Sequence, residues 1–535
     1  MQSRQALVGI LGKYGPFQRR LFLLMSLPVI MKGYQTMMAI LIFAVPSHRC
    51  RVPGFQNDSY VIQDERQKLL VTKAIPRSDD NDKFSQCQVY ASFDNGTYEY
   101  ENWTSSNSTV ECDSWVYDVT ELESTLITQF DLVCDKKAYR AHFSLASMLG
   151  KLIGSSVASV LCDWLGRKPV FYISVIACII IGVVSAFPPS PEVFFVYRLA
   201  LATFGIAFYI SCYVLLLEFV RPSKRRLAGT IMMVVWVIGP FLAGALSYVT
   251  SDWRHIQLGG AVPLVLCIGH WWLVPESPRW LVSKGRTEEA MTVLTKIASA
   301  NDVQVDLESD TPAEEEKTPE EMGFLRAYRL LRKYPKLVVR MLIICFNWVV
   351  VNMTYFGLSL HVANLSGSIR VNYLLSSTVE LTGYLAAWAL LDRLGRKRLH
   401  CACMTLAGTA LLATIPTITL GGKDVQWVTT ALAMVGKMGV SASFSIIYLM
   451  TTELYPTVIR SLGVGGSATV GRVGSVVSPY IADLSLFVGG RFGPALPLIV
   501  FGGLTMAAGG LSLMLPETRH RKLPETLEDA VNFGK

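Results

Sequence analysis

Charged residues are scarce in this sequence, and their scarcity excludes most soluble folds. Asp, Glu, Lys and Arg make up only 17% of the 535 residues, while hydrophobic residues make up 51%. The mean hydropathy of +0.38 is too apolar for a solvated multi-domain chain, and the chain is too long for one soluble domain. A disordered or collagen-like chain is excluded by the same composition. The composition therefore predicts a membrane protein.

The sequence also lacks the signatures of enzymes, metal sites and ATP-driven pumps. No Cys/His cluster has the spacing of metal ligands, and neither a Walker A loop nor a nucleophile elbow is found. We therefore expect no catalytic residue, no metal, no cofactor and no direct use of ATP. A nucleic-acid partner is not expected, because the basic residues lie between long apolar runs. Coupling to Na⁺ or H⁺, exchange and the membrane potential all remain open as driving forces.

Long apolar runs are what the sequence does contain. A transmembrane helix needs about 20 mostly apolar residues, and about twelve such runs are found, which predicts an all-α membrane protein with twelve spans. The predicted spans are 21–45, 140–162, 170–187, 192–217, 228–250, 256–274, 337–360, 370–391, 400–420, 426–451, 461–484 and 493–515.

Basic clusters set the predicted orientation. Lys and Arg gather on the cytoplasmic side of spans, and basic clusters follow the even-numbered spans, most clearly spans 2, 4, 8 and 12. We therefore place both termini in the cytoplasm and the chain in the plasma membrane as a multi-pass protein. The predicted divisions are a cytoplasmic N-terminus (1–20), span 1 (21–45), an extracellular loop (46–139), spans 2–6 (140–274), a cytoplasmic loop (275–336), spans 7–12 (337–515) and a cytoplasmic tail (516–535).

The segment 46–139 has the composition of an extracellular domain. It carries a net charge of −7, whereas the rest of the chain carries +15. Its four cysteines, in an oxidising compartment, predict two disulfides, with three pairings open. Four glycosylation sequons lie in the same segment. The cysteines are Cys50, Cys87, Cys112 and Cys134, and the sequons begin at Asn57, Asn95, Asn102 and Asn107.

An internal repeat divides the chain into two similar six-helix halves. Asp163-Trp-Leu-Gly-Arg-Lys168 matches Asp392-Arg-Leu-Gly-Arg-Lys397 at an offset of 229 residues, and two further motifs match at 235 and 241. Parallel halves of this kind hold the substrate near the bilayer midplane between them. Gly166 and Gly395 permit the turn that each short loop needs.

Charged residues of the repeated loops are candidates for a cytoplasmic gate. Carboxylates and basic side chains that pair across the inner ends of the halves would hold them together and separate when the protein opens inward. The alternative is that the basic residues serve only as topology signals. The candidates are Asp163, Arg167, Lys168, Glu218 and Arg225 in the first half, and Asp392, Arg396, Lys397, Glu453 and Arg460 in the second.

These loops, together with Pro275-Glu-Ser-Pro-Arg-Trp280, resemble those of major facilitator superfamily transporters. Gly15-Pro-Phe-Gln18, His48-Arg-Cys-Arg-Val-Pro53 and Thr452-Glu-Leu-Tyr-Pro-Thr-Val-Ile-Arg460 resemble the organic cation, anion and zwitterion transporter family.

Within that family the likeness is greatest to the carnitine and zwitterion branch, through the stretches 355–360, 379–388, 435–439 and 471–479. One departure is Lys32, where that branch usually has an uncharged polar residue.

The resemblance implies a monomeric, polyspecific carrier of organic cations and zwitterions that works by alternating access. Its substrates would be quaternary ammonium compounds or carnitine-like molecules. An organic anion exchanger of the same family is the main alternative. A sugar porter and a ligand sensor that does not transport are disfavoured.

Two opposite charges inside the predicted spans give the best indication of substrate. Glu380 lies in the middle of span 8 and Arg472 in the middle of span 11, where a charge costs roughly 2.5–3.5 kcal/mol on insertion scales. Acid and base together suit a zwitterion, since a guanidinium binds a carboxylate with two hydrogen bonds. A direct Glu380–Arg472 salt bridge is the alternative. Lys437 is either a second anion partner or the partner of a buried carboxylate.

Aromatic residues are the predicted remainder of a cation site, because ring faces attract ammonium groups. Trp348 and Tyr355 are seven residues apart in span 7 and share one helix face. Tyr209, Trp236 and Tyr448 match positions that line the pocket in the family that the chain resembles. Packing in the core or against lipid is the alternative for these rings.

Overall fold

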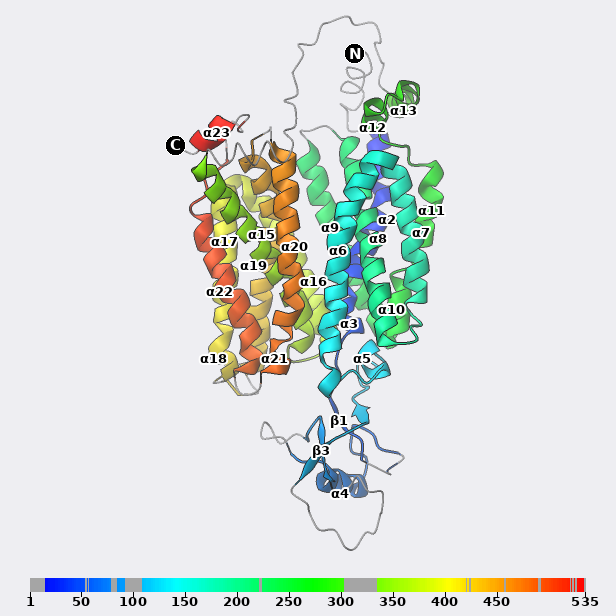
Figure 1. Cartoon of the computed structure of the whole chain (residues 1–535), viewed down its shortest axis with the longest axis vertical. Helices are drawn as coiled ribbons and strands as arrows, with labels where there is room; N and C mark the ends of the chain where they lie inside the picture. The colour runs from blue at the N-terminus through cyan, green and yellow to red at the C-terminus, as the bar shows by residue number, and fades with distance from the viewer. Residues whose placement is uncertain are drawn as a thin grey trace, which may run out of the picture.

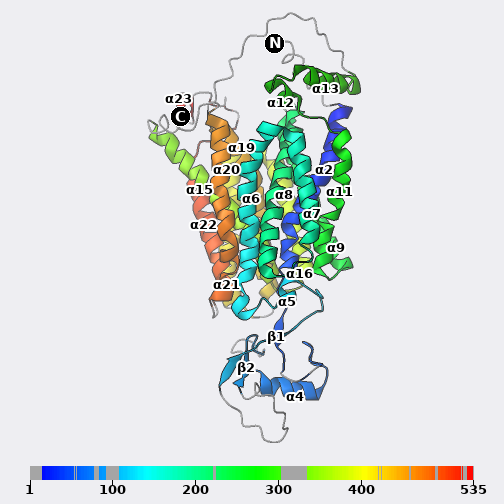
Figure 2. The same cartoon turned by 45° about the vertical axis from the view of Figure 1, so that its right-hand side comes forward.

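The computed structural model is a bundle of long helices with a small disulfide-bonded segment at one end (Figure 1). It describes the whole chain except residues 1–14, 53–54, 56, 78–83, 92–107, 221–223, 303–333, 420, 423–424, 457–458, 489–491, 520, 522–523, 525–526 and 534–535. We call the end with segment 46–137 the disulfide end and the opposite end, with α12, α13 and α23, the α13 end (Figures 1 and 2).

The N-terminal half begins with a helix whose first residue is a proline. Pro16 occupies the first helical position, where its missing N–H costs nothing, and the Gly15 N–H donates to Gln18 Oε1 (3.1 Å). The first span therefore begins before the predicted residue 21. The helices of this half are α2 (Pro16–Met37), α3 (Ala39–Ile42), α6 (Ala138–Leu165), α7 (Arg167–Val184), α8 (Pro191–Glu218), α9 (Arg225–Val249), α10 (Trp253–Gly259), η4 (Val262–Leu264), α11 (Val265–Ile268) and η5 (Gly269–Trp272).

The C-terminal half repeats this arrangement beside the first, and Figures 1 and 2 show the two groups of helices packed side by side. Its elements are α15 (Pro335–His361), η6 (Val362–Asn364), α16 (Ile369–Leu394), α17 (Arg396–Leu412), α18 (Thr414–Thr419), α19 (Gln426–Leu454), α20 (Arg460–Ala482), α21 (Leu484–Phe487), η9 (Gly493–Ala495) and α22 (Leu496–Ser512). Two short helices, α12 (Pro278–Ser283) and α13 (Thr287–Ala300), lie between the halves in sequence. A third, α23 (Leu527–Asn532), follows the C-terminal half.

Ten helices in the described part of the chain are long and apolar enough to cross a membrane, against the twelve spans predicted. The predicted span 256–274 is broken into the short segments α10, η4, α11 and η5, because Pro263 lacks an amide donor. The predicted span 461–484 is the continuous helix α20, but its glycines, serines and two arginines make it less apolar. These two segments account for the difference.

Large apolar side chains face outward around the bundle. Val160, Ile180 and Leu342 are 69%, 59% and 63% exposed, respectively, although all three lie within long helices of the bundle. Water disfavours such a surface, whereas lipid tails accommodate it. The bundle is therefore built for a bilayer.

Gly166 and Gly395 make the same sharp turn at equivalent places in the two halves, as predicted. They separate α6 from α7 and α16 from α17, with φ values of 105° and 88°. A side chain is strained at such φ values. A Cβ would also lie 2.4 Å from Glu276 Oε2 at the first glycine and 2.7 Å from Glu517 Oε2 at the second. The repeat in sequence is thus a repeat in structure.

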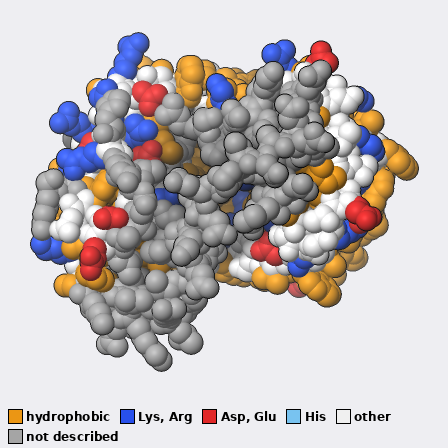
Figure 3. Space-filling model, turned by 90° about the horizontal axis from the view of Figure 1, so that it is seen from above, with side chains coloured by type: hydrophobic (Ala, Val, Ile, Leu, Met, Phe, Trp, Pro, Cys, Tyr) orange, Lys and Arg blue, Asp and Glu red, His pale blue; other side chains and the backbone are white. Residues whose placement is uncertain are grey.

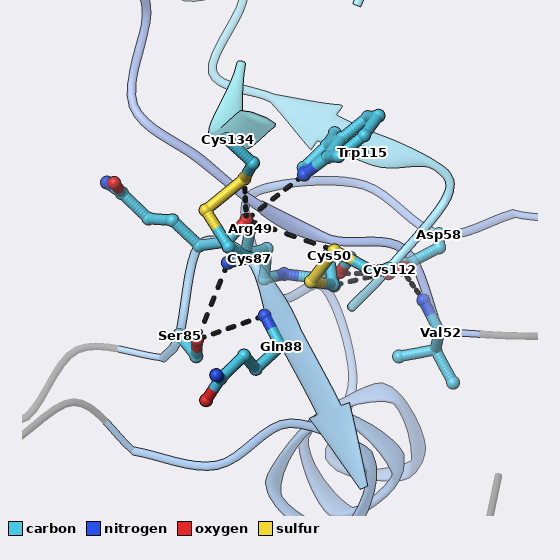
Figure 4. The surroundings of a disulfide bond; sticks show 11 residues. Arg49, Cys50, Val52, Asp58, Ser85, Cys87, Gln88, Cys112, Trp115 and Cys134 are labelled. Atoms are coloured by element: carbon cyan, nitrogen blue, oxygen red, sulfur yellow. Dashed lines mark hydrogen bonds and ion pairs between the residues drawn. A yellow bond between two sulfur atoms is a disulfide. The ribbon is translucent and has the colours of Figure 1, made fainter. Parts of the chain in front are cut away.

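Segment 46–137 is held together by two disulfides, Cys50–Cys112 and Cys87–Cys134 (Figure 4). This confirms the prediction of two disulfides and selects one of the three pairings. Asn57 is exposed, while the sequons at 95, 102 and 107 lie outside the described residues. The elements are β1 (His48–Cys50) antiparallel to β4 (Trp115–Tyr117), β2 (Gln88–Tyr90) antiparallel to β3 (Thr109–Glu111), α4 (Glu65–Ala74), α5 (Leu126–Gln129) and η2 (Cys134–Lys136).

A buried ion pair supports the same segment. Arg49 and Asp58 are 2.5 Å apart, with side chains 3% and 0% exposed, and lie beside the Cys50–Cys112 disulfide (Figure 4). Burial raises the pKa of the Asp58 carboxyl, but hydrogen bonds from Arg49, Val52 and Gln67 outweigh burial and leave the pKa below its usual value. The pair therefore contributes stability at neutral pH, and this stability is lost as pH falls through the folded pKa.

We predict that Arg49→Ala opens segment 46–137 in the full-length protein. Removing one partner of a buried pair costs about 3–5 kcal/mol, which corresponds to an open population more than a hundred-fold larger. Limited proteolysis of this segment measures the change. Lys68→Ala is the matched control, since its partner Glu65 and Lys68 itself are 88% and 60% exposed. Equal cleavage rates for the two variants would contradict the prediction.

Candidate functional site

A cavity of about 130 Å³ lies between the two halves. Four helices of the N-terminal half (α2, α6, α8 and α9) and four of the C-terminal half (α15, α16, α19 and α20) provide its walls. Its lining residues are Lys32, Thr36, Met148, Lys151, Ile206, Tyr209, Met233, Trp236, Trp348, Asn352, Tyr355, Phe356, Tyr384, Phe444, Tyr448, Ala468, Arg472 and Ser475. Six of the eight residues predicted from the sequence to bind substrate are among them.

Aromatic rings form one part of the cavity wall. All five predicted aromatic residues line it: Trp348, Tyr355, Tyr209, Trp236 and Tyr448. Trp348 and Tyr448 meet edge to face with ring centroids 4.5 Å apart, and Tyr209 meets Trp236 in the same way at 5.5 Å. Rings locked in this geometry present fixed faces and edges to the cavity, which suits an organic cation or an aromatic molecule.

Arg472 supplies a positive charge to the same cavity. Its guanidinium donates to the Lys151 carbonyl of α6 (3.1 Å) through Nη1, so α20 and α6 touch across the boundary of the halves. This single bond to a carbonyl leaves most of the guanidinium donors available. Arg472 can therefore accept a carboxylate from a molecule in the cavity.

Glu380, which was predicted to bind substrate, and Lys437, which was predicted either to bind an anion or to pair with a buried carboxylate, are not among the residues that line the cavity. Their charged groups are 3.8 Å apart, and both side chains are buried behind the aromatic wall. Glu380 Oε1 accepts hydrogen bonds from Tyr355 (2.6 Å) and Tyr384 (3.2 Å), and Lys437 donates to Ser376. The carboxylate thus contacts Lys437 and two cavity-lining tyrosines rather than Arg472.

Two lining cations, Lys32 and Lys151, are absent from the predicted site. Lys32 extends from α2, and Lys151 from α6 with its ammonium 4.4 Å from the Phe356 ring centroid. The sequence signal for both residues is their position in the middle of apolar spans. Inserting a lysine there costs free energy unless its ammonium faces a polar space. Tyr384 and Asn352 carry no comparable signal, since buried Tyr and Asn are common in helical cores.

The disulfide end of the cavity is closed by contacts between the halves. Arg140 of α6 lies 3.6 Å from Asp483, which follows α20, and donates to Asn364 (2.9 Å). Segment 46–137 adds a second connection, because Glu121 accepts from the Ile369 amide (2.9 Å) and from the Arg370 side chain. Buried pairs of this kind hold the halves together at this end.

At the α13 end the first predicted gate cluster forms within the N-terminal half. Arg167 pairs with Asp163 (3.0 Å) and with Glu218 (3.1 Å). Glu276 accepts from the backbone amides of Arg167 (3.2 Å) and Lys168 (3.1 Å) at the start of α7, where a carboxylate is favoured by the helix dipole. The cluster therefore joins α6, α7 and α8 to the segment before α12.

The second cluster repeats these contacts in the C-terminal half. Arg396 pairs with Asp392 (3.6 Å) and with Glu453 (3.1 Å), and Glu517 accepts from the Arg396 amide (2.9 Å). The described ion pairs of Arg167 and of Arg396 each stay within one half. That such pairs bridge the halves stays a prediction.

The remaining predicted gate residues have separate places. Lys168 lies 4.5 Å from the Trp271 ring centroid, and Arg460 donates to the Tyr455 carbonyl (3.2 Å). Lys397 is half-buried at the start of α17, and the Arg225 side chain lies outside the described part of the chain. Lys and Arg side chains are spread over this end of the molecule (Figure 3).

Two similar helical halves around a central polar and aromatic cavity define a membrane transporter of the major facilitator fold. The chain belongs to the family described as "Sugar (and other) transporter", whose model matches residues 87–529. Two relatives place it among the organic cation and carnitine transporters of that superfamily. "Organic cation transporter protein" of Drosophila melanogaster is 35% identical over 98% of this chain and 94% of its own length. "Organic cation/carnitine transporter 2" of Homo sapiens is 32% identical over 99% and 94%.

Solved structures support the fold. The inward open conformation of the xylose transporter XylE from E. coli matches with a TM-score of 0.58 at 13% identity, over 94% of this chain and 98% of that one. A D-xylose-proton symporter matches with a TM-score of 0.60 at 13% identity, over 94% and 99%. At this identity the likeness shows the arrangement of helices and not the substrate.

The first prediction from the site concerns the helix-end clusters. The pairs with Glu218 and Glu453 are 11–16% exposed, whereas Asp163 and Asp392 are 77% and 60% exposed. Exposed pairs contribute about 0–1 kcal/mol. We therefore expect Glu218→Gln and Glu453→Gln to slow maximal uptake about ten-fold, and Asp163→Asn and Asp392→Asn about two-fold. Uptake rates at matched surface levels, beside equilibrium ligand binding, measure this. A larger effect of the aspartate variants would contradict the expectation.

The second prediction concerns the buried pair behind the aromatic wall. Glu380→Gln leaves the Lys437 charge without a partner, at a cost of about 3–5 kcal/mol. Folding yield and thermal stability should fall, and the double variant Glu380→Gln with Lys437→Gln should recover most of the loss. Fluorescence-detected thermal unfolding of the purified protein checks both statements. If the double variant is no more stable than the single one, the two residues do not act as a pair.

Proposed function

We propose that the protein is a polyspecific plasma-membrane carrier of organic cations and zwitterions, including quaternary ammonium and carnitine-like compounds, which it moves by alternating access. The printed names of its relatives include organic cation and carnitine transporters. The observation that carries the proposal is the central cavity, where an aromatic wall and a guanidinium face the same space. The protein acts as a monomeric carrier and not as an enzyme, and it needs no cofactor.

The two ends of a zwitterion fit two parts of this cavity. Ring faces of Trp348, Tyr355 and Tyr448 attract a quaternary ammonium with roughly 0.5–2 kcal/mol each. Glu380 strengthens this end from behind, because its negative charge polarises the Tyr355 hydroxyl that donates to it. Arg472 takes the carboxylate with two hydrogen bonds. Specificity then depends on the distance between the two charges of the substrate and not on one close fit.

Alternating access follows from where the halves are joined. The Arg140–Asp483 pair and the Glu121 contacts hold the halves together at the disulfide end, while the clusters around Arg167 and Arg396 stiffen each half at the α13 end. Halves that are internally rigid can rock about the cavity. Opening toward the disulfide end requires the Arg140–Asp483 pair to separate.

We propose the topology on the same basis. The broken segment α10–η5 and the helix α20 complete twelve spans with the ten long apolar helices. Segment 46–139 is extracellular and glycosylated at Asn57, Asn95, Asn102 and Asn107, and both termini are cytoplasmic. The two disulfides support an extracellular location of this segment, since disulfides persist in oxidising compartments. The start of α2 and helix α23 both lie at the opposite end of the molecule (Figure 1).

One observation favours exchange of organic anions as a second candidate function. Lys32, Lys151 and Arg472 line the cavity, whereas no Asp or Glu is found among its described lining residues. A positive cavity attracts anions and repels simple cations. Sugar transport is disfavoured, because three charges are a poor match for a neutral polyol.

We predict that Arg472→Ala lowers the apparent affinity for carnitine and for an aromatic anion by about ten-fold to over a hundred-fold, the value of a lost charge-assisted contact. It should spare or improve uptake of a simple quaternary cation, since one positive charge leaves the cavity. Radiotracer flux of the three compounds and a sugar into proteoliposomes, with and without Na⁺, measures substrate class and coupling together.

Arg286→Ala is the matched control for this experiment, because Arg286 forms a half-exposed pair with Glu289 away from the cavity. Parallel loss of all four fluxes in Arg472→Ala at matched protein levels would reject the role of Arg472 in recognition. Saturable flux of the anion alone would replace the first candidate function by the second. Absence of flux for every compound would reject carrier function.

A further inference from the structure

Four basic side chains converge inside the bundle from four different helices. Lys32 comes from α2, Lys151 from α6, Arg198 from α8 and Arg472 from α20. Lys32 and Arg198 are only 3% and 5% exposed. Lys32, Lys151 and Arg198 line one small cavity, and Lys32, Lys151 and Arg472 line the larger central cavity. Like charges are therefore concentrated where the dielectric constant is low and their repulsion is strong.

The protein partners of these cations are neutral. Arg198 Nε donates to Ser147 Oγ (2.9 Å) and its guanidinium lies 5.3 Å from the Phe43 ring centroid. Lys151 Nζ lies 3.7 Å from Met148 Sδ. In the described ranges, no Asp or Glu oxygen comes within ion-pair distance, 4.0 Å, of any of the four. A buried charge without a counter-charge is expensive.

Among the four cations, the Lys32 ammonium has the fewest polar contacts with the described residues. The described residues offer its ammonium no hydrogen bond or ion pair, and the neighbouring Gln35 Oε1 is buried without a donor. Cys178, which also faces Lys32, donates its thiol proton to the Leu201 carbonyl (3.9 Å) and so supplies no negative charge. The ammonium therefore points into a space that the protein leaves unfilled.

That space is a small chamber beside the central cavity. It has a volume of about 40 Å³, and Lys32, Lys151 and Arg198 line it together with Gln35 and three serines, Ser144, Ser147 and Ser359. Lys32 and Lys151 line both the chamber and the central cavity, so the two spaces adjoin. A volume near 40 Å³ holds a compact anion such as a halide, but neither a carboxylate on a carbon chain nor an aromatic ring.

We propose that the chamber formed by Lys32, Lys151 and Arg198 is a binding site for a compact anion, occupied by an inorganic monoanion such as chloride. Three positive side chains around one small space are the chemistry that recognises such an ion. Its charge offsets the repulsion among the cations. It also lowers the positive potential of the central cavity, so that a quaternary cation can enter beside Lys32, Lys151 and Arg472. Only this last consequence rests on the proposed function.

The binding test uses the purified full-length protein and no transport. Thermal unfolding is followed in sodium chloride and in sodium gluconate at equal ionic strength, because gluconate is too large for the chamber. Ten-fold excess of chloride over its Kd should raise the unfolding midpoint by about 1–2 °C. Lys32→Met and Arg198→Gln should remove this increment, and Lys32→Met should itself be more stable than the parent in gluconate, since an uncompensated charge is gone.

Lys296→Met is the matched control, because Lys296 is exposed on α13, and it should keep the full increment. Equal midpoints in chloride and gluconate would overturn the proposal. An increment that survives in both Lys32→Met and Arg198→Gln would overturn it as well. Stabilisation by succinate but not by chloride, lost in Lys32→Met, would also reject an inorganic anion and would assign the cations to an acidic group of the substrate.

The consequence for transport is measured separately in proteoliposomes. Replacing chloride by gluconate should slow uptake of a quaternary cation at least three-fold in the parent protein and leave the rate in Lys32→Met unchanged. If chloride stabilises the protein but no compound is transported, the proposed function fails and the anion site stands. If uptake of the cation is equally fast in both salts, the coupling between the chamber and cation entry is rejected.

Discussion

A hydrocarbon environment offers a buried charge no hydrogen bond, and this constraint orders the interior of the molecule. Where acid and base meet, as in Glu380–Lys437 and Arg140–Asp483, the charges stabilise contacts between helices. Where bases converge without an acid among the described residues, as around Lys32, Lys151 and Arg198, the positive charges surround a cavity. A charge in this position is costly without a counter-charge.

The duplicated helix-end clusters show how one solution serves both halves. A glycine with positive φ brings a helix start against a carboxylate, Glu276 in one half and Glu517 in the other. An arginine of the same turn then reaches a glutamate at the end of a neighbouring helix. At this end the arginine of each cluster is therefore paired within its own half.

The disulfide-bonded segment acts on the bundle as well as covering it. Glu121 contacts the start of α16 in the C-terminal half, and Ser124 bridges to Asp252 before α10 in the N-terminal half. The two disulfides and the Arg49–Asp58 pair keep this segment folded as one unit. A folded segment that contacts both halves reinforces the Arg140–Asp483 contact at the same end.

Sequence alone determined the features that depend on local chemistry. Apolar runs identify the long helices, the repeated Asp-x-x-Gly-Arg-Lys loops identify the two halves with their glycine turns, and four cysteines in one polar segment predict two disulfides. Five predicted aromatic residues and Arg472 do line the central cavity. Only the tertiary structure decided the disulfide pairing and which charges meet. Glu380 lies against Lys437, and Lys32, Lys151 and Arg198 surround a common chamber. These contacts depend on how helices that are distant in the chain are rotated against one another. The periodicity within one helix does not determine that rotation.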